Sequence, residues 1–137
     1  MANVLVVANR TAECEELQQA LKERAAQGEA KFTLLVPATP HGVAWAADMH
    51  SGSPEAEGHM QKAVEKLRAA GLDVEGVIGD PDPAAAVQDA ANQGSYDEVI
   101  VSTLPTHLSK WLHLDLPRKV AHATGLPVTH VVGSEVK

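Results

Sequence analysis

The sequence predicts an α/β fold in which helices alternate with the strands of one parallel sheet. Short runs rich in valine, leucine and isoleucine recur along the 137 residues, and segments with helical periodicity fill the gaps between them. Crossovers of this length make the strands parallel and the connections right-handed. Only 3% of the residues are aromatic, which suits helices packed closely on a sheet. Residues 1–137 are therefore expected to form one three-layer domain, a length that suits a single core.

Five apolar runs are predicted to be strands. The β-branched run from Val99 to Val101 suits a strand that is buried on both faces. The third run is weaker because Glu75 and Gly76 interrupt it, so an edge position is expected for it. The predicted strands are Val4–Ala8, Lys31–Val36, Val74–Ile78, Val99–Ser102 and Val128–Val132.

Periodicity and capping residues predict four helices. Cys14, Leu17 and Leu21 form an apolar stripe in the first, where Cys14 is expected to be a buried packing residue. Serine or aspartate with a following proline begins each of the other three, and glycine ends each. These markers are Ser53, Pro54 and Gly71, then Asp82, Pro83 and Gly94, then Asp115, Pro117 and Gly125. The segment 39–53 is a long irregular loop, of a length that is usually functional or mobile.

Charge and cysteine content exclude several classes of partner. The formal charge of −7, without a basic cluster, argues against binding to nucleic acid or to an anionic membrane surface. No apolar segment is long enough to span a membrane, and the N-terminus is predicted to be a strand rather than a signal peptide. A single cysteine permits no internal disulfide, so a reducing, cytoplasmic location is expected.

The polar residues that follow the first and fourth strands are the main candidates for ligand binding. In open α/β sheets, ligands bind beyond the carboxyl ends of the strands. After the first strand come Asn9, Arg10 and Thr11; Arg10 suits bidentate contact with an anion, or is simply solvated. After the fourth strand, hydroxyls and an imidazole would contact a ligand, or satisfy the loop backbone. These residues are Ser102, Thr103, Thr106 and His107.

Two aspartates at the same edge have both structural and functional interpretations. Asp80, in the Gly-Asp-Pro-Asp-Pro turn, is explained by turn chemistry, although its position also allows ligand contact. Asp115 fits an N-cap of the last helix, or alternatively a ligand-binding carboxylate. The seven histidines lack metal-ligand spacing, and no nucleophile motif accompanies them. We therefore expect no metal site and no catalytic residues.

Four segments resemble the universal stress protein family. They are VLVVANRTAE, GVIGDPDPAAAV, YDEVIVSTLPTHLSKWLHLDLPRKV and TGLPVTHV, and the resemblance extends over essentially the whole chain. It implies a five-stranded parallel sheet of order 3-2-1-4-5 with helices on both faces. It also implies a homodimer, often formed by pairing of the fifth strands.

Many members of that family bind ATP through a loop of pattern G-x2-G-x9-G-[ST], whose glycines let backbone amides approach the phosphates. Aligned with this chain, the glycine positions fall on Val101, Leu104 and Leu114, and the hydroxyl position falls on Asp115. No glycine occurs between Gly94 and Gly125, so the motif is absent in any register. ATP binding in the family's usual way is therefore not expected, and no cofactor is assigned.

The resemblance and the altered loop lead to one expected function and two alternatives. The expected function is a non-catalytic module, regulatory or binding a small molecule at the carboxyl edge of the sheet. The first alternative is a nucleotide-binding member in which Arg10, Thr103 and His107 replace the missing amide contacts. The second is an enzyme of related nucleotide-hydrolase-like folds, disfavoured because the first strand is followed by neither H-x-G-H nor S-G-G-x-D-S.

Overall fold

A computed structural model describes residues 2–8, 14–37, 53–79, 83–103 and 115–133, which form five strands and four helices. Strands and helices alternate along the chain, as the sequence predicts. The strands are β1 (Ala2–Val7), β2 (Ala30–Pro37), β3 (Val74–Gly79), β4 (Glu98–Thr103) and β5 (Val128–Val132). The helices are α1 (Glu15–Gln27), α3 (Ser53–Ala69), α4 (Pro83–Gln93) and α6 (Leu116–Thr124).

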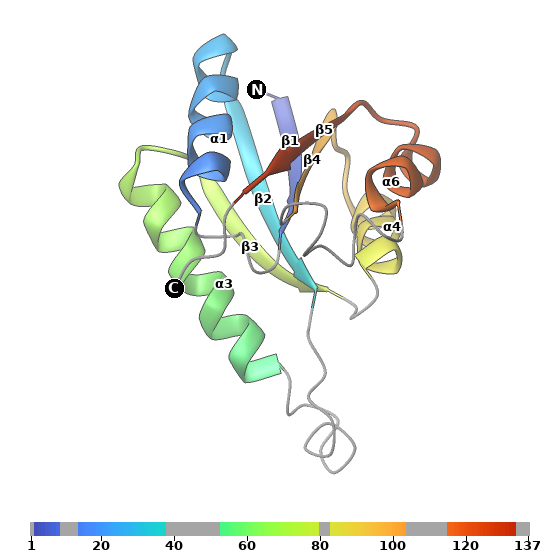
Figure 1. Cartoon of the computed structure of the whole chain (residues 1–137), viewed down its shortest axis with the longest axis horizontal. Helices are drawn as coiled ribbons and strands as arrows, with labels where there is room; N and C mark the ends of the chain where they lie inside the picture. The colour runs from blue at the N-terminus through green and yellow to red at the C-terminus, as the bar shows by residue number, and fades with distance from the viewer. Residues whose placement is uncertain (1, 9–13, 38–52, 80–82, 104–114, 134–137) are drawn as a thin grey trace.

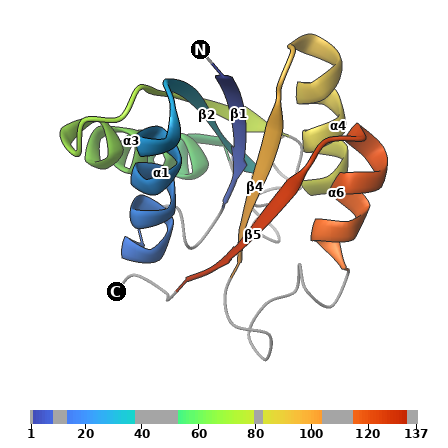
Figure 2. The same ribbon diagram turned by 90° about the horizontal axis from the view of Figure 1, so that it is seen from above.

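The five strands form one parallel sheet of order β3-β2-β1-β4-β5. Helices α1 and α3 lie on one face of this sheet, and α4 and α6 lie on the other (Figures 1 and 2). The predicted three layers, strand order and parallel pairing are confirmed. The interrupted third strand, β3, lies at one edge as predicted, and β5 forms the opposite edge.

Alternating residues of the central strands separate the core into two clusters. Val4 and Val6 of β1 pack toward α1 and α3, whereas Leu5 and Val7 pack toward α4 and α6. All four side chains are completely buried. Hydrophobic burial on both faces explains why β1 and β4 lack the polar alternation of a half-exposed strand.

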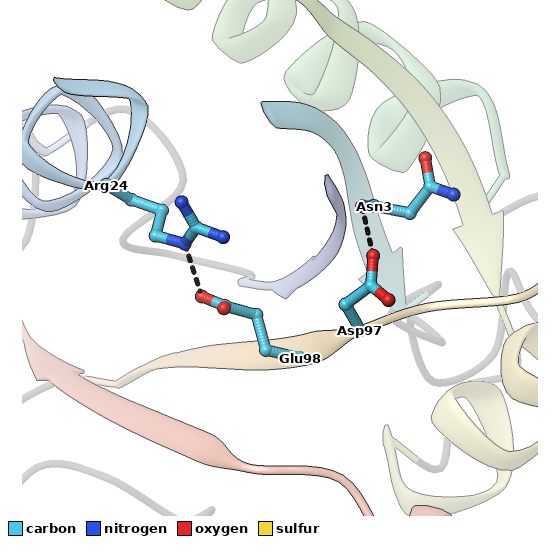
Figure 3. A network of polar contacts seen from close by, with 4 residues as sticks. All are labelled: Asn3, Arg24, Asp97 and Glu98. Carbon is cyan, nitrogen blue, oxygen red and sulfur yellow. Dashed lines mark hydrogen bonds and ion pairs between the residues drawn. The ribbon is translucent and has the colours of Figure 1, made fainter. Parts of the chain in front are cut away.

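The apolar stripe predicted for the first helix is confirmed, and its first residue, Cys14, also caps the helix. Leu17 and Leu21 are buried, and Cys14 is 2% exposed. Cys14 also occupies the N-cap position, where its Sγ accepts a hydrogen bond of 3.4 Å from the amide of Leu17. At the other end of α1, Arg24 Nε donates to Glu98 Oε1 at 3.0 Å, which ties the helix to the start of β4 (Figure 3).

Two glycines fix how α3 and α4 meet the sheet. Gly71, with φ of 91°, ends α3 in a Schellman-type turn in which Leu72 N donates to Leu67 O at 3.2 Å. Gly79 ends β3 beside α4. A Cβ on Gly79 would lie 2.8 Å from Ala86 Cβ and 2.8 Å from Leu35 Cδ1, so glycine permits this packing.

Candidate functional site

The carboxyl ends of β1 and β4 lie side by side at the centre of the sheet, where Val7 is in register with Val101. Strand order reverses between these strands: the chain leaves β1 for β2 through α1 on one face, and leaves β4 for β5 through α6 on the other. Such a switch point is the usual ligand-binding crevice of an open α/β sheet. Ser102 and Thr103, at the end of β4, are the described candidate residues that the fold places there.

Both hydroxyl residues are buried, with Ser102 1% exposed and Thr103 2% exposed. They alternate about the strand, so Ser102 follows Ile100 toward α1 and α3, and Thr103 follows Val101 toward α4 and α6. Thr103 Oγ1 lies 2.7 Å from His130 Nε2. This contact with a side chain of β5 fixes the position of the Thr103 hydroxyl at the end of β4.

His130 is a residue of this edge that sequence reasoning missed. It lies on β5 in register with Val101, diagonal to Thr103, and it is exposed to solvent. The Thr103–His130 contact joins positions 27 residues apart, so no local spacing could reveal it. The two side chains meet because the fourth and fifth strands pair, a neighbourhood that the resemblance to the family implies.

Asp115 stands directly before α6 in the left-handed region, with φ of 56° and ψ of 44°. It is the N-cap residue, as one interpretation predicted, and its carbonyl accepts from Lys119 N at 3.1 Å. Its carboxylate, however, makes no capping hydrogen bond and lies 3.6 Å from Arg118 Nε. The side chain is 61% exposed, so a negative charge faces solvent at the start of α6.

The conformation of Asp115 is one that glycine adopts most readily. A left-handed residue is normally glycine, and aspartate is one of the few others that adopts this region. Among the described residues, Asp115 is the one non-glycine residue with positive φ. An alignment shifted by one residue would put the third glycine of the pattern on Asp115 instead of Leu114. The same spacing then places the first glycine on Ser102 and the hydroxyl on Leu116, so the motif remains absent.

The remaining candidates lie outside the described residues. They are Asn9, Arg10, Thr11, Asp80, Thr106 and His107, together with residues 39–52 of the predicted loop 39–53, whose last residue begins α3. Within the described ranges, no three His, Cys, Asp or Glu side chains gather as a metal site would require. None of the helices described is both long enough and apolar enough to cross a membrane.

A separate surface pocket of about 600 Å³ lies along α1 and is bordered by Lys66 of α3. Its wall mixes carboxylates, amides and lysines, and none of the candidate residues lines it. The mixture of charges selects no particular ligand chemistry.

The strand order and the polar end of β4 define an open parallel α/β domain, a class that holds small ligands beyond the carboxyl ends of its strands. A model of the universal stress protein family matches residues 1–131. The chain therefore belongs to the universal stress protein family. A comparison with curated proteins finds no match.

Solved structures of the same family share the fold at low sequence identity. A universal stress protein from Archaeoglobus fulgidus in complex with dAMP is 16% identical, with a TM-score of 0.67 and coverage of 96% of this chain and 97% of that one. A family protein from Arabidopsis thaliana with AMP bound is 15% identical, with a TM-score of 0.67 and coverage of 98% and 93%. A universal stress protein in complex with cAMP is 20% identical, with a TM-score of 0.65 and coverage of 97% and 98%.

Proposed function

We propose that this chain is a non-catalytic stress-response module that binds a small molecule at the carboxyl edge of its sheet and does not hold ATP through the family's glycine loop. The observation that carries this proposal is the left-handed Asp115 before α6. In the alignment shifted by one residue, its carboxylate occupies the position where the family pattern has a glycine beside the phosphates. The other two glycine positions, Ser102 and Pro105, carry side chains as well.

Electrostatics explains why this substitution disfavours a polyphosphate. The positive end of a helix dipole and its free amides normally attract a phosphate to a helix N-terminus. Two like charges 4 Å apart repel by about 1 kcal/mol in water and by about 4 kcal/mol at the effective dielectric near a protein surface. Arg118 offsets part of this repulsion, but both side chains are more than 60% exposed, and exposed ion pairs contribute little.

A nucleotide with fewer phosphates is the second candidate. The relatives with bound AMP, dAMP and cAMP favour it, because each of those ligands carries a single phosphate. The buried hydroxyl residues Ser102 and Thr103 and the exposed His130 lie toward the carboxyl edge of this sheet. On this hypothesis, the ligand would be recognised through its base and sugar more than through its phosphate.

Calorimetric titration of the full chain with ATP and Mg²⁺, AMP, cAMP and adenosine tests both candidates. Asp115→Asn is the informative variant, because asparagine tolerates the left-handed region and removes only the charge. We expect no micromolar ATP binding by the wild type, and at least about a fivefold gain in phosphate-ligand affinity in the variant. Asp73→Asn, an exposed change before β3 at the opposite edge of the sheet, is the matched control. Micromolar ATP binding by the wild type overturns the proposal.

Mass spectrometry of small molecules released from the purified, denatured chain separates the two candidates. A retained nucleotide favours the second candidate, and a different retained compound favours the first. The absence of nucleophile and metal motifs in the sequence supports a non-catalytic role. Net charge, the single cysteine and the family membership support a cytoplasmic homodimer without nucleic-acid or membrane partners.

A further inference from the structure

The inward face of α3 is a stripe of four apolar residues that packs on β2 and β3 (Figure 1). Met60, Ala63, Val64 and Leu67 follow the spacing i, i+3, i+4 and i+7, which places them on one side of the helix. The last three are buried, whereas Met60 is partly exposed and lies at the border of the core. The most accessible residue of the stripe is therefore the one that contains sulfur.

The sulfur of Met60 lies directly over Gly76 of β3. A Cβ added to Gly76 would overlap Met60 Sδ, and it would lie 2.9 Å from Met60 Cγ and 3.0 Å from Val64 Cγ2. The thioether thus occupies the space that any other residue at position 76 would fill with its own side chain. This packing gives a structural reason for the glycine that interrupts the apolar pattern of β3.

We propose that Met60 is a site of reversible oxidation by hydrogen peroxide, and that its sulfoxide loosens α3 from β3. A lone pair of Sδ attacks one oxygen of the peroxide. The S–O bond forms as the O–O bond breaks, and the second oxygen leaves as water with both protons. The sulfur loses two electrons and the peroxide gains them, so no other reactant is needed. This inference concerns the packing of α3 and does not depend on the ligand proposed for the carboxyl edge.

The sulfoxide fits this position poorly for two reasons. Its added oxygen needs room, and the sulfur already fills the space beside Gly76, so the oxidised side chain would be overpacked. The oxygen also converts an apolar group into a hydrogen-bond acceptor, which is costly to bury in an apolar cluster without a donor. The oxidised side chain is therefore expected to turn outward, which leaves a gap between α3 and β3 at Gly76.

The effect should be local, because the last turn of α3 has contacts of its own. Leu67 is 2% exposed, and Arg68 Nε donates to Val74 O at 2.8 Å. These contacts do not involve Met60, so they should keep the end of the helix on the sheet after oxidation. The alternative is that Met60 only fills space in the core and is oxidised only when the whole chain unfolds. The two interpretations differ in whether the folded chain reacts and in where its backbone opens.

Hydrogen peroxide treatment of the folded full chain, followed by peptide mapping and amide hydrogen exchange, is the primary test. We expect sulfoxide at Met60 in the folded chain. Amide exchange around Met60 should then be at least about tenfold faster, with less than about a twofold change in α6. Reduction by the two methionine sulfoxide reductases should restore the original exchange. A folded chain that forms no sulfoxide at Met60, an unchanged exchange after oxidation, or a change that the reductases do not reverse overturns the proposal.

Met60→Leu is the matched control, because leucine replaces methionine with little change in volume and cannot form a sulfoxide. The other sulfur-containing residues, Met1, Cys14 and Met49, are all retained in this variant. Peroxide should therefore leave its amide exchange within about twofold of the untreated value. Equal acceleration of exchange in the variant and the wild type would assign the effect to another residue and overturn the proposal.

Gly76→Ala tests the position of the sulfur. The added methyl group should push the thioether outward and raise the rate of sulfoxide formation at Met60 at least about threefold. Gly79→Ala adds the same group on the opposite face of β3, against Ala86 and Leu35, and controls for a general loss of stability. Equal rates of Met60 oxidation in the two variants overturn the placement of the sulfur over Gly76.

Discussion

Asn3 and Asp97 bond to each other twice at the amino end of the sheet. Asp97 N donates to Asn3 O at 2.8 Å, and Asn3 N donates to Asp97 Oδ2 at 2.7 Å (Figure 3). The carboxylate satisfies a backbone amide of β1 at the point where β4 has not yet begun. The bonding between β1 and the β4 segment therefore begins one residue before β4 itself, at the side chain and amide of Asp97.

Replacement of Asp97 is expected to lower the free energy of unfolding in a graded way. Asp97→Ala removes the acceptor and should cost about 1–2 kcal/mol, since hydrogen bonds to charged groups are the stronger ones. Asp97→Asn keeps a neutral acceptor and should cost less. Urea denaturation measures the series, and an alanine variant as stable as the wild type would contradict it. Asn3→Ala, which keeps the backbone amide, is the control.

The left-handed backbone at Asp115 should affect the stability of the fold, independently of ligand binding. Asp115→Ala is expected to destabilise the protein by about 1 kcal/mol, because alanine in this region is strained. Asp115→Gly removes the strain and is expected to be as stable as the wild type or slightly more stable. Thermal unfolding provides the comparison, and equal melting temperatures for the two variants would show that the strain is absent.

The close approach of α4 to β3 should make Gly79 intolerant of a methyl group. Gly79→Ala is expected to cost about 1–3 kcal/mol, as overpacking of a tight core does. Gly28→Ala is the control, because nothing lies within 4 Å of a Cβ there and its φ of 162° is extended. The control should change the free energy of unfolding by less than about 1 kcal/mol. Similar values for the two variants in chemical denaturation would argue against tight packing at Gly79.

The contact between Thr103 and His130 should appear as an energetic coupling. In a double-mutant cycle with Thr103→Val and His130→Ala, we expect a coupling of about 0.5–1 kcal/mol, as for an ordinary neutral hydrogen bond. Nitrogen-15 NMR of the histidine ring gives an independent readout, since loss of the hydroxyl should shift the tautomer balance of His130. Additive mutational effects together with an unchanged ring spectrum would rule the contact out.

The fold was largely predictable because its signals are local and strong. The β-branched run Val99–Val101 lies in a buried strand, as its composition predicts. The helix Leu116–Thr124 ends before Gly125, as the glycine predicts. The strand ends were less predictable: β1 begins at Ala2 rather than Val4, because Ala2 N donates to Glu29 O at 3.0 Å. A strand extends as far as the neighbouring strand can pair with it, and that neighbour is distant in sequence, so the end of a strand cannot be predicted from local residues.

The candidate site was predictable only in its location. Ser102, Thr103 and Asp115 follow from the predicted strand ends, because ligands of an open α/β sheet bind beyond the carboxyl ends of its strands. The left-handed conformation of Asp115 could not be read from the sequence, because an aspartate before a proline-containing helix also fits an ordinary extended N-cap. His130 was missed for a different reason, since strand alternation alone does not show which neighbour a side chain reaches.

Because Cys14 is a buried N-cap, the reactivity of its thiol can report local unfolding at the start of α1. Cys14 is the one cysteine of the sequence, and its sulfur is covered while α1 stays docked. A thiol reagent can react only when this part of the molecule opens, so the labelling rate reports the free energy of that opening without any engineered site. The rate measured with and without a bound small molecule would reveal whether ligand binding makes the first turn of α1 open less often.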